Sequence, residues 1–426
     1  MNIFVNPPKS QWRELCRRVE SEQSSINCTI SAILSKVKEG GDRAIKEILQ
    51  EIDGTTLDSL AVTPQEIECA SNEVDKNLKD AIVTAAENIA KFHAAQRKQS
   101  VEVTTMEGVV CKRRTLAIDK VGLYIPGGSA PLFSTLLMLA IPAKIAGCKD
   151  IILCTPCNKE GKVASAVLYA AKYCGVDKIY KVGGAQAIAA MAYGTETIPQ
   201  VYKIFGPGNR YVTGAKQQVS AQGVAIDMPA GPSEVMILAD ESANAAYVAA
   251  DMLSQAEHGA DSQAMAITLS ETFAQQIKDH VQSQLAQLPR YSIAAKALEQ
   301  SRIIVVDSRE DMVELANLYG AEHLIISVED PWEIANQITA AGSIFVGNYS
   351  PESAGDYASG TNHTLPTMGL ATAYSGIGLE SFMHSITYQE LSQEGLNTLA
   401  KTIITMAEAE GLDAHANAVK VRINNN

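Results

Sequence analysis

The sequence is short of positive charge. Against 48 Asp and Glu it has only 35 Lys and Arg, which leaves a formal net charge of -13. A surface with this excess of negative charge repels the phosphate backbone of nucleic acids and the anionic headgroups of membranes. We therefore expect neither nucleic acid nor a membrane as a partner.

Long apolar runs are also missing. The longest, residues 130–143, contains Pro131 and Pro142 and stops at Lys144, which is short of the roughly 20 apolar residues that a membrane-spanning helix needs. The first residues include Pro7 and Pro8 and have no apolar core of the kind found in a signal peptide. The sequence predicts a soluble, cytoplasmic protein.

Cysteine is too sparse for a disulfide scaffold, with eight in 426 residues. Cys154 and Cys157 form one C-x-x-C pair, but the second pair that a zinc ribbon requires is not evident. No neighbouring cationic residue favours a thiolate at this pair. We expect Cys154 and Cys157 to be ordinary reduced thiols.

The rest of the chain is strongly patterned. Apolar residues recur at steps of three and four in residues 26–100, which predicts helices. From Val121 onward, short apolar runs alternate with Ala-rich stretches, as is typical of parallel sheets built from βαβ units. The predicted strands form two series, 121–125, 151–154, 179–182, 202–205 and 224–226, then 235–238, 264–269, 303–306, 324–327 and 344–346. We expect two α/β sheets in tandem.

From about residue 377 the pattern is interpreted as helical again, mainly over residues 391–410 and after Asp413. One amphipathic helix cannot bury a core of its own. We therefore expect this tail to dock on the rest of the chain or on a partner subunit.

Three turns after strands of the first sheet are rich in glycine and proline. Ligands of open parallel sheets bind at such turns, and glycine lets backbone N–H groups approach a phosphate. None of the turns has the G-x-G-x-x-G fingerprint of dinucleotide-binding proteins. Each carries one side chain suited to a nucleotide, namely Tyr124, Gln186 or Asn209. The spacing equally allows Gln186 and Asn209 only to tie their loops.

Polar residues near histidines are candidates for a metal site. Gln255 and His258 are three apart near the end of a predicted helix, so they share a face and can supply half of a zinc site. Asp356 with His363 and Glu410 with His415 form two further clusters. An isolated Q-x-x-H is more often a solvated helix end, but the set as a whole favours metal ligands.

Glu322 precedes His323, and such a pair can move protons near neutral pH. The other histidines, His93, His280 and His384, belong to no such cluster. We expect those three to lie on the surface.

Taken in order, these segments closely resemble the histidinol dehydrogenases, from about residue 30 to residue 421. The matching segments are GLYIPGG at 122–128, VGGAQA at 182–187, IFGPGN at 204–209, IDMPAGPSE at 226–234, SQAEH at 254–258, EHL at 322–324, SAGDY at 353–357 and NH at 362–363. So many matches in one order make the resemblance specific.

The resemblance implies an α/β fold of two tandem incomplete Rossmann-like parallel-sheet domains with helical N-terminal and C-terminal extensions, in an intertwined homodimer. The implied division is 1–20 for the N-terminal extension, 21–122 with 236–377 for a substrate and metal domain, 123–235 for an NAD-binding domain, and 378–426 for a helical dimerisation segment.

The family oxidises L-histidinol through L-histidinaldehyde to L-histidine with zinc and two NAD, the last steps of histidine biosynthesis. The resemblance implies zinc ligands at Gln255, His258, Asp356 and His415. It implies that Ser233, His323 and Glu410 join them in binding substrate, and that Glu322 and His323 are the acid/base pair. It further implies NAD contacts at Tyr124, Gln186 and Asn209, and that Glu410 and His415 reach the neighbouring subunit's site.

Four alternatives stay open. The substrate of a related zinc-dependent NAD dehydrogenase could be another amino or sulfonated alcohol. A cysteine, with Cys148 ahead of Cys111, could carry the aldehyde as a thiohemiacetal. The same metal ligands could serve a hydrolase, or a binding protein without catalysis.

Overall fold

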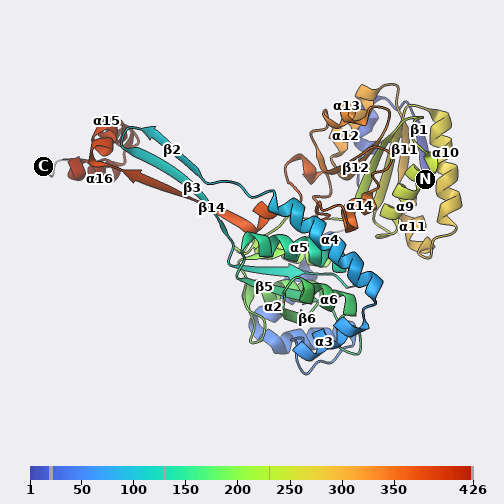
Figure 1. Ribbon diagram of the computed structural model, residues 1–426, viewed down its shortest axis with the longest axis horizontal. Coiled ribbons are helices and arrows are strands. Elements are labelled where there is room, and N and C mark those ends of the chain that lie inside the picture. Colours follow the sequence, from blue (N-terminus) through green and yellow to red (C-terminus); the bar gives the residue numbers. More distant parts are fainter. Residues whose placement is uncertain (19–22, 128–130, 230, 424–426) are drawn as a thin grey trace.

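The fold consists of two parallel sheets and a long antiparallel arm (Figure 1). The structure is a computed structural model that describes residues 1–18, 23–127, 131–229 and 231–423. Residues 128–129 of the first glycine-rich turn and residue 230 lie outside the described residues. The prediction of an α/β protein with two parallel sheets is confirmed.

The first sheet has five parallel strands in the order β6-β5-β4-β7-β8. They are β4 (Lys120–Tyr124), β5 (Asp150–Thr155), β6 (Lys178–Lys181), β7 (Lys203–Phe205) and β8 (Ala225–Ile226). The connecting helices are α5 (Phe133–Ala146), α6 (Ser165–Tyr173), α7 (Gly184–Tyr193) and α8 (Arg210–Ser220). The chain runs outward from β4 to β6 and returns to β7 on the other side of β4, so the strand order reverses between β4 and β7.

The second sheet has six parallel strands in the order β1-β11-β10-β9-β12-β13. They are β1 (Asn2–Val5), β9 (Glu234–Ala239), β10 (Gln263–Thr268), β11 (Arg302–Val305), β12 (Ala321–Ser327) and β13 (Ala341–Val346). Its helices are α1 (Lys9–Leu15), α9 (Ala245–Ala256), α10 (Glu271–Leu285), α11 (Tyr291–Glu299), α12 (Arg309–Tyr319), α13 (Pro331–Ala335) and α14 (Glu352–Tyr357). The N-terminal segment thus adds an edge strand that the sequence pattern did not predict.

Helices from the N-terminal part cover the first sheet, although we expected residues 21–122 beside the second. They are α2 (Gln23–Ile48), α3 (Pro64–Glu73) and α4 (Lys76–Ala94), with η1 (Leu49–Asp53) after α2. The apolar face of α2 packs on α7 and α8, and α4 packs on α5. Periodicity reveals the apolar face of a helix but not which sheet covers it.

His93 is an error of the sequence analysis, because it is fully buried at the end of α4 and not on the surface. Its Nδ1 lies 2.8 Å from the carbonyl oxygen of Ile89, and its Nε2 lies 3.4 Å from Nδ2 of Asn362. His280 and His384 are exposed, as expected.

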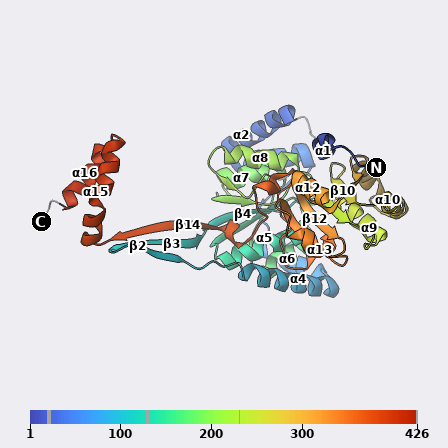
Figure 2. The ribbon, with the colours of Figure 1, turned by 90° about the horizontal axis from the view of Figure 1, so that it is seen from above.

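The arm joins β2 (Val101–Met106), β3 (Val109–Ala117) and β14 (Met383–Leu391) in an antiparallel sheet with β3 in the middle. The expectation of a helix from residue 377 is wrong for β14, which pairs with β3 along all nine of its residues. Helices α15 (Gln393–Ala409) and α16 (Asp413–Ile423) form the tip, far from both sheets in either view (Figures 1 and 2). No described helix is long and apolar enough to cross a membrane.

Candidate active site

The two sheets meet with different ends of their strands, which we call the carboxyl edge and the amino edge of a sheet. Only seven residues of sequence separate the carboxyl end of β8 from the amino end of β9. The carboxyl edge of the first sheet, with its glycine-rich turns, therefore lies next to the amino edge of the second. Glu322 and His323, at the start of β12, and Gln255, at the end of α9, belong to that amino edge.

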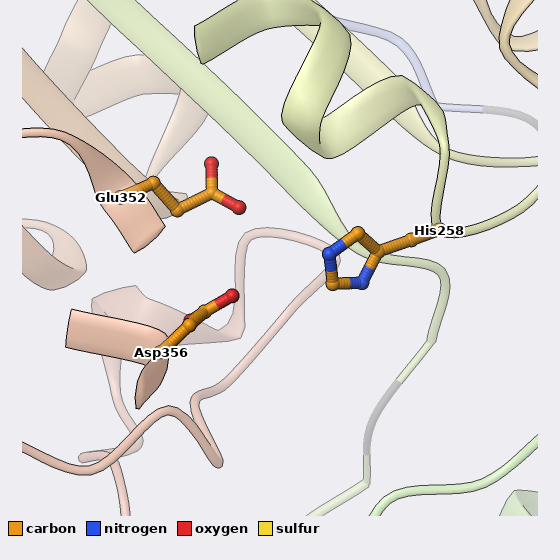
Figure 3. Close-up of side chains that lie close together, drawn as sticks. All are labelled: His258, Glu352 and Asp356. Carbon is orange, nitrogen blue, oxygen red and sulfur yellow. The ribbon is translucent and has the colours of Figure 1, made fainter. Parts of the chain in front are cut away.

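His258, Glu352 and Asp356 converge at this edge, with ligand atoms that all lie within 4.8 Å of one another. Figure 3 shows the two carboxylates pointing from α14 toward the imidazole of His258. His258 follows the end of α9 in a turn, where its N–H donates to the carbonyl oxygen of Gln255. Three nitrogen and oxygen donors at such separations suit a divalent metal ion such as zinc.

Gln255 adds a fourth donor on the Glu352 side of this cluster, and its side chain is fully buried. With the amide turned so that its nitrogen donates, that nitrogen lies 2.6 and 2.9 Å from the two carboxylate oxygens of Glu352. In the opposite orientation the amide oxygen faces the carboxylate, an arrangement that only a cation or proton between them would stabilise. Gln255 is therefore held against one carboxylate of this cluster.

His323 is buried between two carboxylates. Its Nδ1 lies 3.7 Å from Oε2 of Glu322, and its Nε2 lies 3.5 Å from Oδ1 of Asp356. Neither ring nitrogen has a hydrogen-bond partner among the described residues. A buried imidazole with both nitrogens unbonded is available to a substrate hydroxyl or a water molecule. Glu322 is held in place, since its Oε2 accepts a hydrogen bond of 2.9 Å from the backbone N–H of Glu234.

Burial and neighbouring charges shift the pKa values of the ionisable side chains in the site. Burial raises the pKa of Glu322 and of Glu352, because a buried carboxylate loses its hydration. Burial also opposes charge on His323, but the carboxylates of Glu322, Glu352 and Asp356 outweigh it and raise the pKa of His323. Burial therefore favours the neutral forms of Glu322 and Glu352, and a divalent cation bound beside them would favour their ionised forms instead.

His363 links the site to the first sheet. Its Nδ1 lies 2.9 Å from the backbone oxygen of Asp356, and its Nε2 lies 2.9 Å from the hydroxyl of Thr135 on α5. Both nitrogens are thus engaged in holding the loop after α14. His363 acts here as a support for Asp356.

Glu410 and His415 are not brought to the site within one chain. They are exposed residues at the tip of the arm, Glu410 at the end of α15 and His415 in α16. The arm carries both away from the sheets (Figure 2). Ser233 is near the site in sequence and structure, since it immediately precedes β9.

Tyr124, Gln186 and Asn209 all lie at the carboxyl edge of the first sheet. Tyr124 ends β4, and its hydroxyl accepts a hydrogen bond of 3.1 Å from the N–H of Gly184 at the start of α7. Asn209 caps α8, with its Oδ1 accepting from the N–H groups of Tyr211 and Val212. Tyr124 and Gln186 are each only 4% exposed. They therefore form the inner wall of this edge, whereas Asn209 is exposed.

Comparison with known proteins decides the family. The family profile described as histidinol dehydrogenase matches residues 16–423. The chain belongs to the histidinol dehydrogenase family. This result confirms the resemblance inferred from the sequence motifs, and it makes the protein a member of a family of oxidoreductases.

Individual relatives are similar to this chain over almost its full length. The chain is 58% identical to the histidinol dehydrogenase of Bacteroides fragilis (strain YCH46), with 99% of each chain covered. It is 54% identical to that of Vibrio vulnificus (strain CMCP6), with 95% of this chain and 93% of the relative covered. The crystal structure of histidinol dehydrogenase from Elizabethkingia anophelis matches with a TM-score of 0.97 and 50% identity, covering 99% of this chain and 98% of that one.

Glu352 is the site residue that the sequence analysis missed. It stands four residues before Asp356, a spacing that places two side chains on the same face of a helix. That spacing was the available signal, but Glu352 has no neighbouring histidine in the sequence and so did not stand out.

Proposed function

We propose that this protein oxidises L-histidinol to L-histidine through L-histidinaldehyde, with zinc and two molecules of NAD, as the last steps of histidine biosynthesis in the cytoplasm. The observation that carries the proposal is the convergence of His258, Glu352 and Asp356 beside the unbonded imidazole of His323. Membership of the histidinol dehydrogenase family supports it.

Zinc would be held by Gln255, His258 and Asp356 of one chain together with His415 of a second chain. The ligand atoms of His258, Glu352 and Asp356, which all lie within 4.8 Å of one another, fit a cation there. When bound, zinc supplies a Lewis acid that can orient nitrogen atoms of the substrate. Ser233 and Glu410 are proposed to complete the substrate site.

His323 is the proposed base for the substrate hydroxyl. Although burial opposes it, the carboxylates of Glu322, Glu352 and Asp356 raise the pKa of His323 to about 10 and so favour its protonated form. A cation bound at Glu352 and Asp356 would weaken that effect, and an unprotonated ring nitrogen could then accept the hydroxyl proton as the adjoining carbon loses hydride. NAD supplies the hydride acceptor in each oxidation. Glu322 is proposed to remove a proton from water, which adds to the aldehyde and gives the hydrate for the second oxidation. The backbone N–H of Glu234 keeps the Glu322 carboxylate in place for this role.

The dinucleotide is proposed to bind along the carboxyl edge of the first sheet, against Tyr124, Gln186 and Asn209. This edge includes the point between β4 and β7 where the strand order reverses, and such points form ligand crevices in open α/β sheets. Because the Oδ1 of Asn209 already caps α8, its amide nitrogen is the group left to contact the cofactor.

A homodimer would complete the site. The arm exposes apolar side chains on its strands and terminal helices, including Val101, Val103, Met406 and Leu412. Within one chain nothing on the two sheets contacts α15 or α16 in the described structure (Figure 1). Docking the arm on a second copy would bury these side chains and deliver Glu410 and His415 to that copy's site.

The test is to supply purified protein with L-histidinol, zinc and NAD. The proposal expects two NADH for each histidinol consumed and histidine as the product. If no NADH forms in the presence of histidinol, the proposed function is wrong, and the hydrolase or binding-protein alternative is left. A parallel panel of other amino and sulfonated alcohols would identify a different dehydrogenase substrate.

A further inference from the structure

A buried ion pair lies beneath the turn that follows β7. The Nζ atom of Lys216, in α8, contacts Oδ1 of Asp227, just after β8, and the two side chains are 3% and 1% exposed. Removing two charges from water is costly, so a buried pair is weak as a device for stability alone. The hydrogen bonds that Lys216 and Asp227 make to the backbone indicate a role other than stability.

Both charged groups hold the backbone of one residue, Gly206. Oδ2 of Asp227 accepts a hydrogen bond of 2.8 Å from the N–H of Gly206. Nζ of Lys216 donates a hydrogen bond of 2.8 Å to the carbonyl oxygen of Gly206. Charge-assisted hydrogen bonds of this kind are roughly twice as strong as neutral ones. The ion pair therefore fixes the N–H and the C=O of the same residue.

Gly206 has no freedom to move toward β4. Its φ is 130°, and a Cβ atom built on it would lie 2.1 Å from the backbone oxygen of Tyr124. The turn at 206–209 thus packs backbone to backbone against the end of β4. Tyr124 ends β4 and Gly206 follows β7, the neighbours between which the strand order reverses. Open α/β sheets bind ligands at such points.

We propose that Lys216 and Asp227 are positioning residues for the dinucleotide, which hold the Gly206 turn in its binding shape before the cofactor arrives. This inference rests on the proposed NAD-dependent function. The charged atoms of both side chains are engaged with each other and with the backbone of Gly206, so both act through Gly206. A preformed turn lowers the ordering cost of binding and therefore strengthens it.

The double substitution Lys216→Met with Asp227→Asn tests the proposal. It removes both charges together. The one side-chain oxygen at position 227 can accept from the Gly206 N–H, but the Met228 N–H then loses the acceptor that it has in Oδ1 of Asp227. We expect the Kd for NADH, measured by fluorescence, and the KM for NAD to rise about tenfold, which is the size of one lost hydrogen bond. The kcat, the KM for histidinol and the zinc content should stay unchanged, because the second sheet is not altered.

An exposed ion pair of the same residue types lies at the other end of the same sheet and serves as a control. Lys178 and Asp150 form an ion pair of 2.5 Å at the amino ends of β6 and β5. Lys178→Met with Asp150→Asn removes the same charges away from the crevice, so NADH binding should not change. An equal loss of NADH affinity in both double variants would mean that the sheet as a whole is weakened, and would overturn the proposal.

NADH binding by the wild-type protein distinguishes a failure of this inference from a failure of the proposed function. If it binds no NADH, the NAD-dependent function fails and the inference fails with it. If it binds NADH and the Lys216→Met, Asp227→Asn variant binds equally well, only the inference is overturned. Should that variant not fold, hydrogen exchange of the wild-type amides at 204–209 decides, because Gly206 must be protected before cofactor is added. Unprotected exchange there would overturn the proposal.

Discussion

The carboxylate of Glu352 lies against the side-chain amide of Gln255, and both side chains are buried. When the amide nitrogen faces Glu352, the amide oxygen accepts a hydrogen bond of 3.1 Å from the backbone N–H of Glu234. The carboxylate of Glu352 therefore holds the amide nitrogen of Gln255 toward itself. A cation beside Glu352 would favour the reverse orientation, with the Gln255 oxygen toward the ion.

Replacing Glu352 with Gln should weaken zinc binding. The substitution removes one carboxylate from the cluster with His258 and Asp356. It also removes the carboxylate that contacts the amide of Gln255. Outer partners of metal ligands are worth about 10- to 100-fold in affinity, which sets the expected loss. Zinc competition with a chromophoric chelator measures it. Glu299→Gln, at the exposed end of α11, is the control, and unchanged zinc affinity in Glu352→Gln would contradict this role.

Glu322→Gln should separate the two oxidations. The amide oxygen of Gln can still accept from the N–H of Glu234, so the site keeps its shape but loses the base for water. Oxidation of added histidinaldehyde should fall by roughly 10²- to 10⁴-fold, the usual effect of losing an acid/base group. Histidinol should still yield the aldehyde and one NADH. Equal losses in both steps, each followed separately, would remove Glu322 from the activation of water.

Subunit sharing predicts complementation between two inactive variants. His415→Asn should lose zinc, and His323→Asn should lose the base, yet a mixed dimer would contain one site with both residues intact. After denaturation and joint refolding, random pairing should restore roughly a quarter of wild-type activity. Refolding each variant alone is the control. No recovery from a mixture shown to form mixed dimers would mean that His415 serves its own chain.

A catalytic thiol is the chemical alternative that the structure argues against most directly. Cys148 is 7% exposed, and burial raises the pKa of its thiol to about 11. At neutral pH it is therefore almost wholly protonated and a poor nucleophile. Cys111 lies in β3 of the arm. We expect Cys148→Ala with Cys111→Ala to keep both oxidation steps, as followed by NADH and histidine formation. Loss of aldehyde oxidation alone would revive the thiohemiacetal.

The strands were the most predictable part of the fold, for a physical reason. Strands such as β5 and β10 are buried on both faces, so each appears in the sequence as an uninterrupted apolar run. β14 has mostly exposed side chains and pairs only within the arm, so it lacks that pattern. β1 is four residues long and is placed by its pairing with β11, which follows it by 300 residues in the sequence (Asn2 pairs with Arg302).

The site was only partly predictable. His258 and Asp356 stand in motifs that mark them, but their approach depends on α9 and α14 returning to one sheet edge. Glu352 had only its spacing from Asp356 as a signal, and Lys216 on α8 had none, since a charged residue on a helix is usually solvated. Burial, which decides their role, is a property of the folded chain.

Arg18 offers the last prediction, on how the N-terminal segment supports the site. It forms hydrogen bonds of 2.5 and 2.8 Å with the carboxylate of Glu234, whose side chain is 2% exposed. Arg18→Met leaves that carboxylate buried without its partner, which typically costs about 3–5 kcal/mol. Urea unfolding should show this loss, whereas Arg13→Met, at an exposed position of α1, should show almost none. Adding Glu234→Gln should recover much of the stability, because the double variant no longer buries a lone charge. If the double variant were as unstable as Arg18→Met, packing of the Arg18 side chain over Tyr319, and not its charge, would hold the segment in place.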